Sequence, residues 1–207
     1  SYSALLRKRI FVPLHIVQVG PRAIGYAADG AKGRAHQWDL QWASGAGAIV
    51  LNAADMLRWD AALLDVGPFS TEERSRLFAP SLLTTSVGGH YAAGFIVDSV
   101  AGRPLYWHNG EVGGFHTANF LFPADDLAIV VLSNDQRTEA EAIAMQTYGA
   151  FAGLDPNVLT FTDGGWAVAR RQLLVLVAVV AIAIALAVVL YRWLRRRRQA
   201  RVAQLSR

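Results

Sequence analysis

The 207-residue sequence contains no cysteine, which excludes disulfide frameworks and cysteine-based zinc sites. It also contains no acidic residue from position 170 onward, although nine arginines lie there. The net charge of the whole chain is +4, but residues 1–169 hold 11 basic and all 16 acidic residues, a net charge of −5. The basic character therefore belongs to the C-terminal tail, and the rest of the chain gives no reason to expect a nucleic-acid partner.

A serine activated for nucleophilic attack is also missing. Such a serine needs a nearby base, and the patterns Ser-x-x-Lys and Gly-x-Ser-x-Gly are two common signs of one. Lys8 and Lys32 do not follow a serine at the first spacing, and Ser44 and Ser86 lack the first glycine of the second pattern. We therefore expect this chain to be catalytically inert on its own.

A long hydrophobic run lies near the C-terminus. Residues 173–191 contain 19 residues without a charge, and a helix of that length is close to the roughly 30 Å hydrocarbon core of a membrane. A buried helix of a globular domain usually keeps a polar face, which this run lacks. We therefore predict a linker over residues 153–170 and a transmembrane helix over residues 171–193.

The charges on either side of this run predict its orientation. Seven arginines follow the run and two precede it, so the positive-inside rule places the basic tail at 194–207 in the cytoplasm and the soluble domain on the outer side. The four arginines at 195–198 would then contact anionic lipid of the bilayer, rather than nucleic acid. An alternative is a sorting signal that is cut off, since two glycines precede the run, but Arg170 and Arg171 interrupt that pattern.

Helical patterns begin and end the soluble part. Residues 1–10 have the pattern of the end of an amphipathic helix, which Pro13 stops. Asn52 and Asp55 are spaced like the two partners of a capping box. The helix that follows them is expected to bury an apolar stripe made of Ala53, Met56, Leu57, Leu63 and Leu64.

Two further helices are marked by their first residues. Ser70 or Thr71 can cap a short helix over residues 71–78. Thr138 and Glu141 form a T-x-x-E capping box. The apolar face of the helix after this box is predicted to consist of Ala140, Ile143, Ala144 and Phe151.

Between these helices the pattern changes to short apolar runs rich in β-branched and aromatic residues. They lie at 93–98, 104–108, 117–122 and 128–133 and are separated by turn residues such as Gly113 and Gly114. This spacing predicts an antiparallel meander. Helices, a meander and a further helix indicate the α+β class, and the meander needs more cover than this chain supplies.

Four stretches resemble the serine β-lactamase-related family, which includes class C β-lactamases and D-Ala-D-Ala carboxypeptidases. They are SYSALLRKRIFVPLHI (1–16), GAGAIVLNAADMLRWDAALL (45–64), WHNGEVGGFHTANFLFP (107–123) and LAIVVLSN (127–134). Their order resembles the C-terminal part of that domain, so the resemblance implies that residues 1–152 are truncated at the N-terminus. It also implies a β-lactamase/transpeptidase-like fold, with an antiparallel sheet flanked by helices.

The resemblance implies attack by a serine on a carbonyl and an acyl-enzyme that water clears. Of the family's three active-site boxes, only the third, in its His-x-Gly form, has a match here, in His108-Asn109-Gly110. His108 and Gly110 are therefore expected to be catalytic. The backbone N–H of Glu111 would help to form the oxyanion hole. The predicted substrate-binding residues are Asn109, Glu111, Gly113 and Gly114.

Other interpretations of these residues remain open. An isolated His-Asn-Gly is more often a strand-end histidine bonded to backbone, and Asn109 stands where threonine or serine is common in the family. His90, His108 and His116 lack the accompanying carboxylates or spacing of a metal site, so neither a metal nor a cofactor is expected.

The sequence therefore favours a fragment of a membrane-anchored serine hydrolase that acts outside the membrane. The expected substrate is a small molecule or peptide with an amide or ester bond, such as a D-Ala-D-Ala-type or other peptidoglycan-derived peptide, or a β-lactam. One alternative is a non-catalytic wall-binding or regulatory homologue. Another is a membrane-tethered interaction module that is complete in itself.

Overall fold

The computed structural model describes residues 2–17, 23–27, 33–36, 39–65, 67–81, 89–155, 159 and 182. The chain divides into two compact units, residues 1–164 and 165–207, and Ile182 is the one described residue of the second. The predicted run at 173–191, apart from Ile182, and the tail at 194–207 therefore lie outside the described residues. Within the described part of the chain, no helix is long and apolar enough to cross a membrane.

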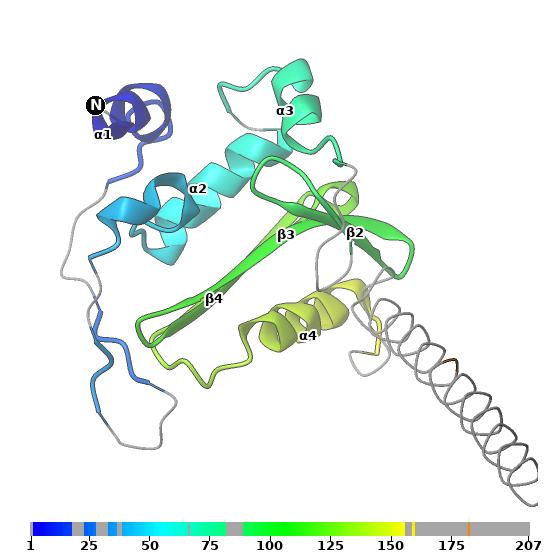
Figure 1. Ribbon diagram of the computed structural model, residues 1–207. Coiled ribbons are helices and arrows are strands. Elements are labelled where there is room, and N and C mark those ends of the chain that lie inside the picture. The colour runs from blue at the N-terminus through cyan, green and yellow to red at the C-terminus, as the bar shows by residue number, and fades with distance from the viewer. Residues whose placement is uncertain are drawn as a thin grey trace, which may run out of the picture. The chain divides into compact units, whose positions relative to one another are not determined.

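A five-stranded antiparallel sheet forms the centre of the first unit (Figure 1). Its strands lie side by side in sequence order: β1 His90–Tyr91, β2 Ile96–Val100, β3 Arg103–Val112, β4 Phe115–Phe122 and β5 Leu127–Ser133. The predicted meander and the α+β class are confirmed. Strand β1 was not predicted, and β3 continues four residues beyond the predicted end at residue 108.

Two tight hairpins set the register of this sheet. Ala101 and Gly102 join β2 to β3, and Gly113 and Gly114 join β3 to β4, in each case between directly paired residues. All four residues have positive φ, at 51° and 75° in the first turn and 57° and 83° in the second. Two consecutive positive φ angles are the requirement of a type I′ turn, whose twist matches that of the strands it joins. Between β4 and β5 the chain forms a short 3₁₀ turn, η3 Pro123–Asp125.

Helices cover both faces of the sheet, as Figure 1 shows for α2 and α4. Helix α4 Ala140–Ala152 covers the face that carries Trp107, Phe120 and Phe122. The ring of Phe122 stacks on that of Tyr148, with centroids 3.6 Å apart. These side chains form the largest apolar cluster of the described residues and anchor α4 to the sheet.

The opposite face packs against α2 Ala53–Leu64 and the end of α3 Thr71–Leu77. Leu63 of α2 clusters with Leu121 of β4. Phe78, which follows α3, stacks on Tyr106 of β3 with ring centroids 4.0 Å apart. The outer side of α2 is covered by the N-terminal segment, whose helix α1 Tyr2–Leu6 continues as a π-helical turn, η1 Arg7–Phe11. A 3₁₀ helix, η2 Gln41–Ala46, precedes α2.

Two predicted helix caps are confirmed. The side-chain oxygen of Asn52 accepts a hydrogen bond from the backbone N–H of Asp55 at 2.8 Å. Ser70 and Glu73 form a reciprocal capping box at the start of α3. Each cap satisfies backbone donors that have no partner inside the helix, so the starts of α2 and α3 follow from local sequence.

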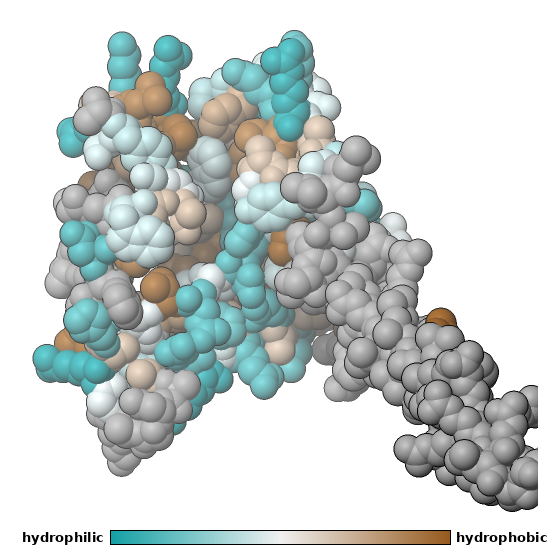
Figure 2. Space-filling model, in the orientation of Figure 1, coloured by the Kyte–Doolittle hydropathy of each residue, from teal (hydrophilic) through white to brown (hydrophobic). Residues whose placement is uncertain are grey.

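The predicted cap and face of α4 are wrong in part. Thr138 bonds to Ser133 instead of capping the helix. Ala140 and Ala144 are buried as predicted, but Ile143 and Phe151 are 42% and 59% exposed. On the face that Figure 2 displays, hydrophobic side chains lie among hydrophilic ones. Met145 and Tyr148 are buried instead, because they pack against the aromatic side chains of the sheet.

The predicted stripe of α2 is also wrong in part. Leu57 is 42% exposed, whereas Asp55 and Asp60 are buried. Asp55 is held by the cap at Asn52 and by an ion pair with Arg58. Asp60 has a partner on the sheet, described below, and a polar side chain can replace an apolar one in a stripe where such a partner exists.

Candidate active site

Residues 108–110 lie in the part of β3 where the strand has lost one of its two neighbours. Strand β2 pairs with β3 only up to Trp107, whereas β4 pairs with it up to Val112. From residue 108 to 112, one edge of β3 therefore has no strand partner among the described residues. The N–H and C=O groups along such an edge can pair with an extended ligand or another strand.

Successive positions of β3 face opposite sides of the sheet. His108 and Gly110 face the α2 side, because their cross-strand neighbours are Asn119, which bonds to α2, and Thr117. Asn109 faces the α4 side, where it bonds to that helix. The two residues predicted to be catalytic are thus brought to one face, and the side chain of Asn109 lies on the other.

The imidazole of His108 has a hydrogen-bond partner at each nitrogen. Its Nδ1 lies 2.6 Å from the carbonyl oxygen of Asn109, and its Nε2 lies 3.2 Å from the hydroxyl of Tyr91. The side chain is partly exposed. The ring therefore has a fixed orientation and remains accessible from solvent, as a group that meets a substrate must be.

Gly110 has little free space above its Cα on this face. A Cβ atom built there would lie 3.2 Å from Oγ1 of Thr117, whose hydroxyl is 3.4 Å from the carbonyl oxygen of Gly110. A contact at that distance is tighter than ordinary van der Waals packing, so any side chain at this position requires Thr117 to move. The predicted catalytic role of Gly110, as room for a substrate, stays a prediction.

A polar cluster lies directly behind the box, on the α4 side. The carboxylate of Glu141, in the first turn of α4, accepts a hydrogen bond from Nδ2 of Asn109 and lies 2.9 Å from Nε2 of His116 on β4. One carboxylate thus links α4 to two adjacent strands. A substrate on the His108 face would meet only the backbone of Asn109, and the predicted contact with its side chain gains no support from this geometry.

The remaining predicted substrate-binding residues lie at the end of the β3–β4 hairpin. The carboxylate of Glu111 accepts a hydrogen bond from the side chain of Gln136. A Cβ atom on Gly114 would lie 2.5 Å from the backbone nitrogen of Tyr26 and 2.6 Å from a backbone carbon of Gly25. Gly113 and Gly114 thus form the hairpin turn, and Gly114 also lets the backbone of residues 25 and 26 approach closely. Their contact with a substrate stays a prediction.

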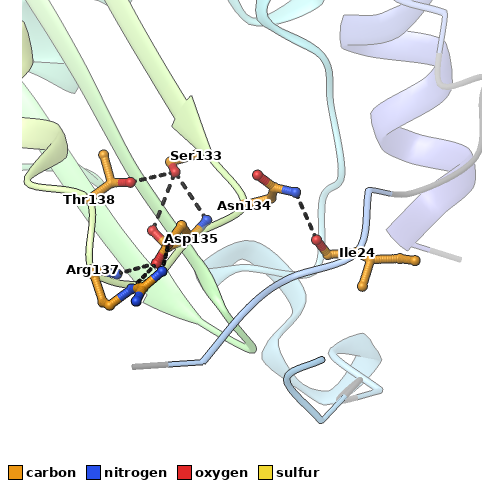
Figure 3. Close-up of polar contacts among 6 residues, drawn as sticks. All are labelled: Ile24, Ser133, Asn134, Asp135, Arg137 and Thr138. Atoms are coloured by element: carbon orange, nitrogen blue, oxygen red, sulfur yellow. Dashed lines mark hydrogen bonds and ion pairs between the residues drawn. The ribbon is translucent and has the colours of Figure 1, made fainter. Parts of the chain in front are cut away.

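The segment 23–27 closes this end of the sheet (Figure 3). The side chain of Asn134 donates to the carbonyl oxygen of Ile24 at 2.9 Å. The backbone N–H of Tyr26 donates to the carbonyl oxygens of Gly114 in the hairpin and of Asn134 after β5. Beside them Arg137 pairs with Asp135 and lowers the pKa of that carboxyl to about 2. The loop between β5 and α4 therefore holds its shape and docks the segment against the hairpin.

A second polar pair lies on the His108 face, between α2 and β4. Nδ2 of Asn119 donates to Oδ1 of Asp60 at 2.8 Å. Asp60 is fully buried and Asn119 is 9% exposed. Burial raises the pKa of Asp60 to about 7, and the bond from Asn119 lowers it only in part. Asp60 Oδ2 and Asn119 Oδ1 are both buried without a hydrogen-bond partner in the described part of the chain.

The sequence contained partial signals for these additional residues. Asp60 falls four residues after Met56 and three before Leu63, so it lies within the predicted apolar stripe. The T-x-x-E pattern predicts a local role for Glu141 as a cap, whereas its carboxylate contacts Asn109 on β3 and His116 on β4. The proximity of Tyr91 to His108 has no local signal, since it depends on the pairing of the two-residue strand β1 with β2.

A cavity of about 540 Å³ lies between α2 and α3. Its lining includes Leu63, Phe78 and Tyr106, but none of residues 108–110. The His108 box thus lies at an open strand edge, apart from this cavity. No group of three or more His, Asp or Glu side chains that could hold a metal ion occurs in the described ranges.

Two curated proteins are similar to this sequence. The sequence is 27% identical over 145 residues to "Putative penicillin-binding protein PbpX" of Bacillus subtilis (strain 168), covering 65% of this chain and 35% of that protein. It is 30% identical over 98 residues to unguisins hydrolase of Aspergillus campestris, covering 44% of this chain and 18% of that protein. The chain thus spans about a third or less of these two relatives.

Solved structures share the fold. The octameric penicillin-binding protein homologue from Pyrococcus abyssi superposes with a TM-score of 0.62 at 19% identity, covering 83% of this chain and 41% of that one. D-Amino acid amidase from Ochrobactrum anthropi SV3 gives a TM-score of 0.57 at 18% identity, with coverage of 73% and 49%. The family model for beta-lactamase matches residues 1–154. With its sheet, its helices and its His-Asn-Gly strand, the chain belongs to the beta-lactamase family.

Proposed function

We propose that this chain is the C-terminal part of a serine hydrolase that cleaves amide or ester bonds through an acyl-enzyme. The observation that carries the proposal is the position of His108 and Gly110 on one face of β3, beside a strand edge with no partner among the described residues. Such an edge can pair with the extended backbone of a substrate. A side chain from the same strand then lies near the bond that is cleaved.

The residues of β3 have separate roles in this proposal. His108, accessible on the α2 side, takes part in proton transfer to or from the leaving group. The backbone N–H of Glu111 donates to the substrate carbonyl oxygen as negative charge develops on it. Asn109 contributes through its backbone, while its side chain holds the strand against Glu141.

The nucleophilic serine and its base belong, in this proposal, to a part of the protein outside the 207 residues. The coverage of relatives supports this, because the chain spans 35% of the Bacillus protein and less than half of the solved structures. The names of these relatives favour small-molecule or peptide substrates. We propose the class of amides and esters that includes β-lactams and D-Ala-D-Ala-type, peptidoglycan-derived peptides.

We also propose that the protein is anchored in the cell membrane with its soluble domain on the outer side. The support comes from the sequence alone: an uncharged run at 173–191 and seven arginines after it against two before it. Such an anchor would place the hydrolase beside the cell wall. It would also make the bilayer a permanent partner of the C-terminal segment.

The reaction class can be tested by covalent labelling. The full-length protein encoded by the surrounding reading frame is incubated with a fluorescent penicillin, and the adduct is mapped by mass spectrometry. We expect one adduct on a serine outside residues 1–207 and none on the 207-residue chain alone. An adduct on a serine of this chain would show that the nucleophile has been misplaced. No hydrolysis of any amide or ester, and no adduct, would favour a non-catalytic wall-binding homologue.

The role of the box is tested by replacing His108 with alanine in the full-length protein. Loss of a proton-transfer group slows a reaction by about 10²–10⁴-fold, whereas a partly exposed side chain contributes little to packing. We expect slower acylation with an unchanged melting temperature. His90→Ala, at an exposed position of β1, serves as the control. A variant at His108 that melts several degrees lower and keeps its acylation rate would contradict the assignment.

A further inference from the structure

We propose that Tyr91 is a positioning residue for His108, and that its hydroxyl holds the ring in place by donating a hydrogen bond to Nε2. The inference deepens the proposed function and rests on it. It starts from one contact, the 3.2 Å between the hydroxyl oxygen of Tyr91 and Nε2 of His108. The two rings meet edge to face, with centroids 5.9 Å apart and planes at 82°.

The backbone of β3 determines the protonation of the other nitrogen. Nδ1 of His108 lies 2.6 Å from the carbonyl oxygen of Asn109. A carbonyl oxygen can only accept a hydrogen bond, so Nδ1 must carry a proton. In the neutral ring Nε2 is then an acceptor, and the hydroxyl of Tyr91 is its donor. Nε2 is therefore the nitrogen of His108 that can take up a proton, and Tyr91 holds it until a reacting group takes the place of the hydroxyl.

The same two contacts hold the orientation of the ring. A 180° rotation about the bond that joins the ring to Cβ would place carbon atoms where Nδ1 and Nε2 lie, and both hydrogen bonds would be lost. With Tyr91 absent, one of the two remains and Nε2 has no donor on the protein side. Second contacts of this kind fix the orientation of catalytic histidines in many enzymes.

Tyr91 is itself held by the backbone around it. Its carbonyl oxygen accepts a hydrogen bond from the N–H of Ser81 at 2.8 Å, and β1 pairs with β2 opposite Ile96. Its side chain is 37% exposed. Removal of the hydroxyl therefore leaves the backbone position unchanged and creates no buried cavity, which separates a positioning role from a structural one.

The test compares Tyr91→Phe with Tyr26→Phe in the full-length protein. Tyr26 is a matched control, because its side chain is 39% exposed and its described contacts are made by its backbone. The first measurement is the ¹⁵N NMR spectrum of the His108 ring at about pH 9, where histidines are ordinarily neutral. We expect the Nε2 resonance to move downfield in Tyr91→Phe and to stay in place in Tyr26→Phe, with equal melting temperatures.

The second measurement is the rate of acylation and hydrolysis. Misplacement of a reacting group by about 1 Å can slow a reaction about 100-fold. We therefore expect kcat of Tyr91→Phe to fall by about 10- to 100-fold, with little change in KM. An Nε2 resonance that does not move, or that moves equally in the control, overturns the inference. Full activity of Tyr91→Phe overturns it as well. A wild-type protein without hydrolase activity would instead refute the proposed function, and the NMR result would still decide whether Tyr91 holds His108.

Discussion

The buried carboxyl group of Asp60 should make the stability of this protein depend on pH. Its pKa is raised to about 7 by burial, against an ordinary value of 3.8. Below about pH 4 the folded and unfolded states both carry the proton, and the group has no effect. Between about pH 4 and 7 the folded state holds a proton that the unfolded state has lost, so stability falls as the pH rises. Above pH 7 the loss is complete and constant.

The size of this loss follows from the pKa shift. About three pKa units at 1.36 kcal/mol each correspond to about 4 kcal/mol. Asparagine at position 60 would stay neutral at every pH and keep the bond from Nδ2 of Asn119. Its amide would also supply an N–H donor beside Asn119 Oδ1. In the wild type this atom and Asp60 Oδ2 have no hydrogen-bond partner in the described part of the chain. Asp60→Asn should therefore stabilise the protein by up to about 4 kcal/mol at pH 8 and hardly at all at pH 4.

The assay is thermal and urea unfolding of the full-length protein and the variant at several pH values between about 4 and 8. For a domain of about 150–250 residues, 4 kcal/mol corresponds to a rise of about 8–16 °C in melting temperature, and the rise is smaller in a larger full-length protein. Asp65→Asn, at the residue that follows the same helix, is the control, since the side chain of Asp65 is 80% exposed and its ion pair contributes about 1 kcal/mol or less. A difference between Asp60→Asn and wild type that is absent, or equal at pH 4 and 8, would refute the reasoning.

Three further outcomes are expected. Gly114→Ala should destabilise the fold by about 3 kcal/mol or more, because Gly114 has φ 83° and a Cβ there would lie 2.5–2.6 Å from backbone atoms. The control is Gly94→Ala, where φ is 87° but no atom lies within 4 Å of the added Cβ. In urea unfolding this control should lower the free energy of unfolding by only about 1 kcal/mol. Glu141→Ala should cost about 1–3 kcal/mol by leaving Asn109 and His116 unpaired, and an unchanged unfolding midpoint would argue against the cluster. Protease added to intact spheroplasts should digest the soluble domain and spare an epitope on the tail at 194–207; protection of the domain would overturn the proposed topology.

The fold was predictable where local chemistry determines it. Asn52 and Ser70 begin helices because their side chains satisfy backbone donors nearby, and the glycine turns fix the β3–β4 hairpin. The two-residue strand β1 was missed because it is too short for any periodicity to show. Its pairing with β2 is nevertheless what brings Tyr91 to His108.

The site was predictable only in part, for a different physical reason. The alternation of side chains along β3 follows from the strand itself, and once the strand is known it places His108 and Asn109 on opposite faces. Glu141 could satisfy a local cap or a distant amide, and the sequence favoured the cap because it does not show that α4 packs on β3 and β4. Asp60 was missed since its partner Asn119 is 59 positions away.

The distances in sequence between contacting residues also suggest an order of folding. The meander from β2 to β5 joins neighbouring strands through short turns, so its pairs close small loops at little entropic cost. The bond from Asn134 to Ile24 instead closes a loop of 110 residues. Contacts of that separation form late, and a segment whose side chains Ile24 and Tyr26 are 38% and 39% exposed opens easily in local fluctuations. The segment 23–27 should therefore exchange its amide hydrogens faster than strands β3 and β4. The β3–β4 hairpin next to His108-Asn109-Gly110 should then be the part of the sheet that solvent reaches first.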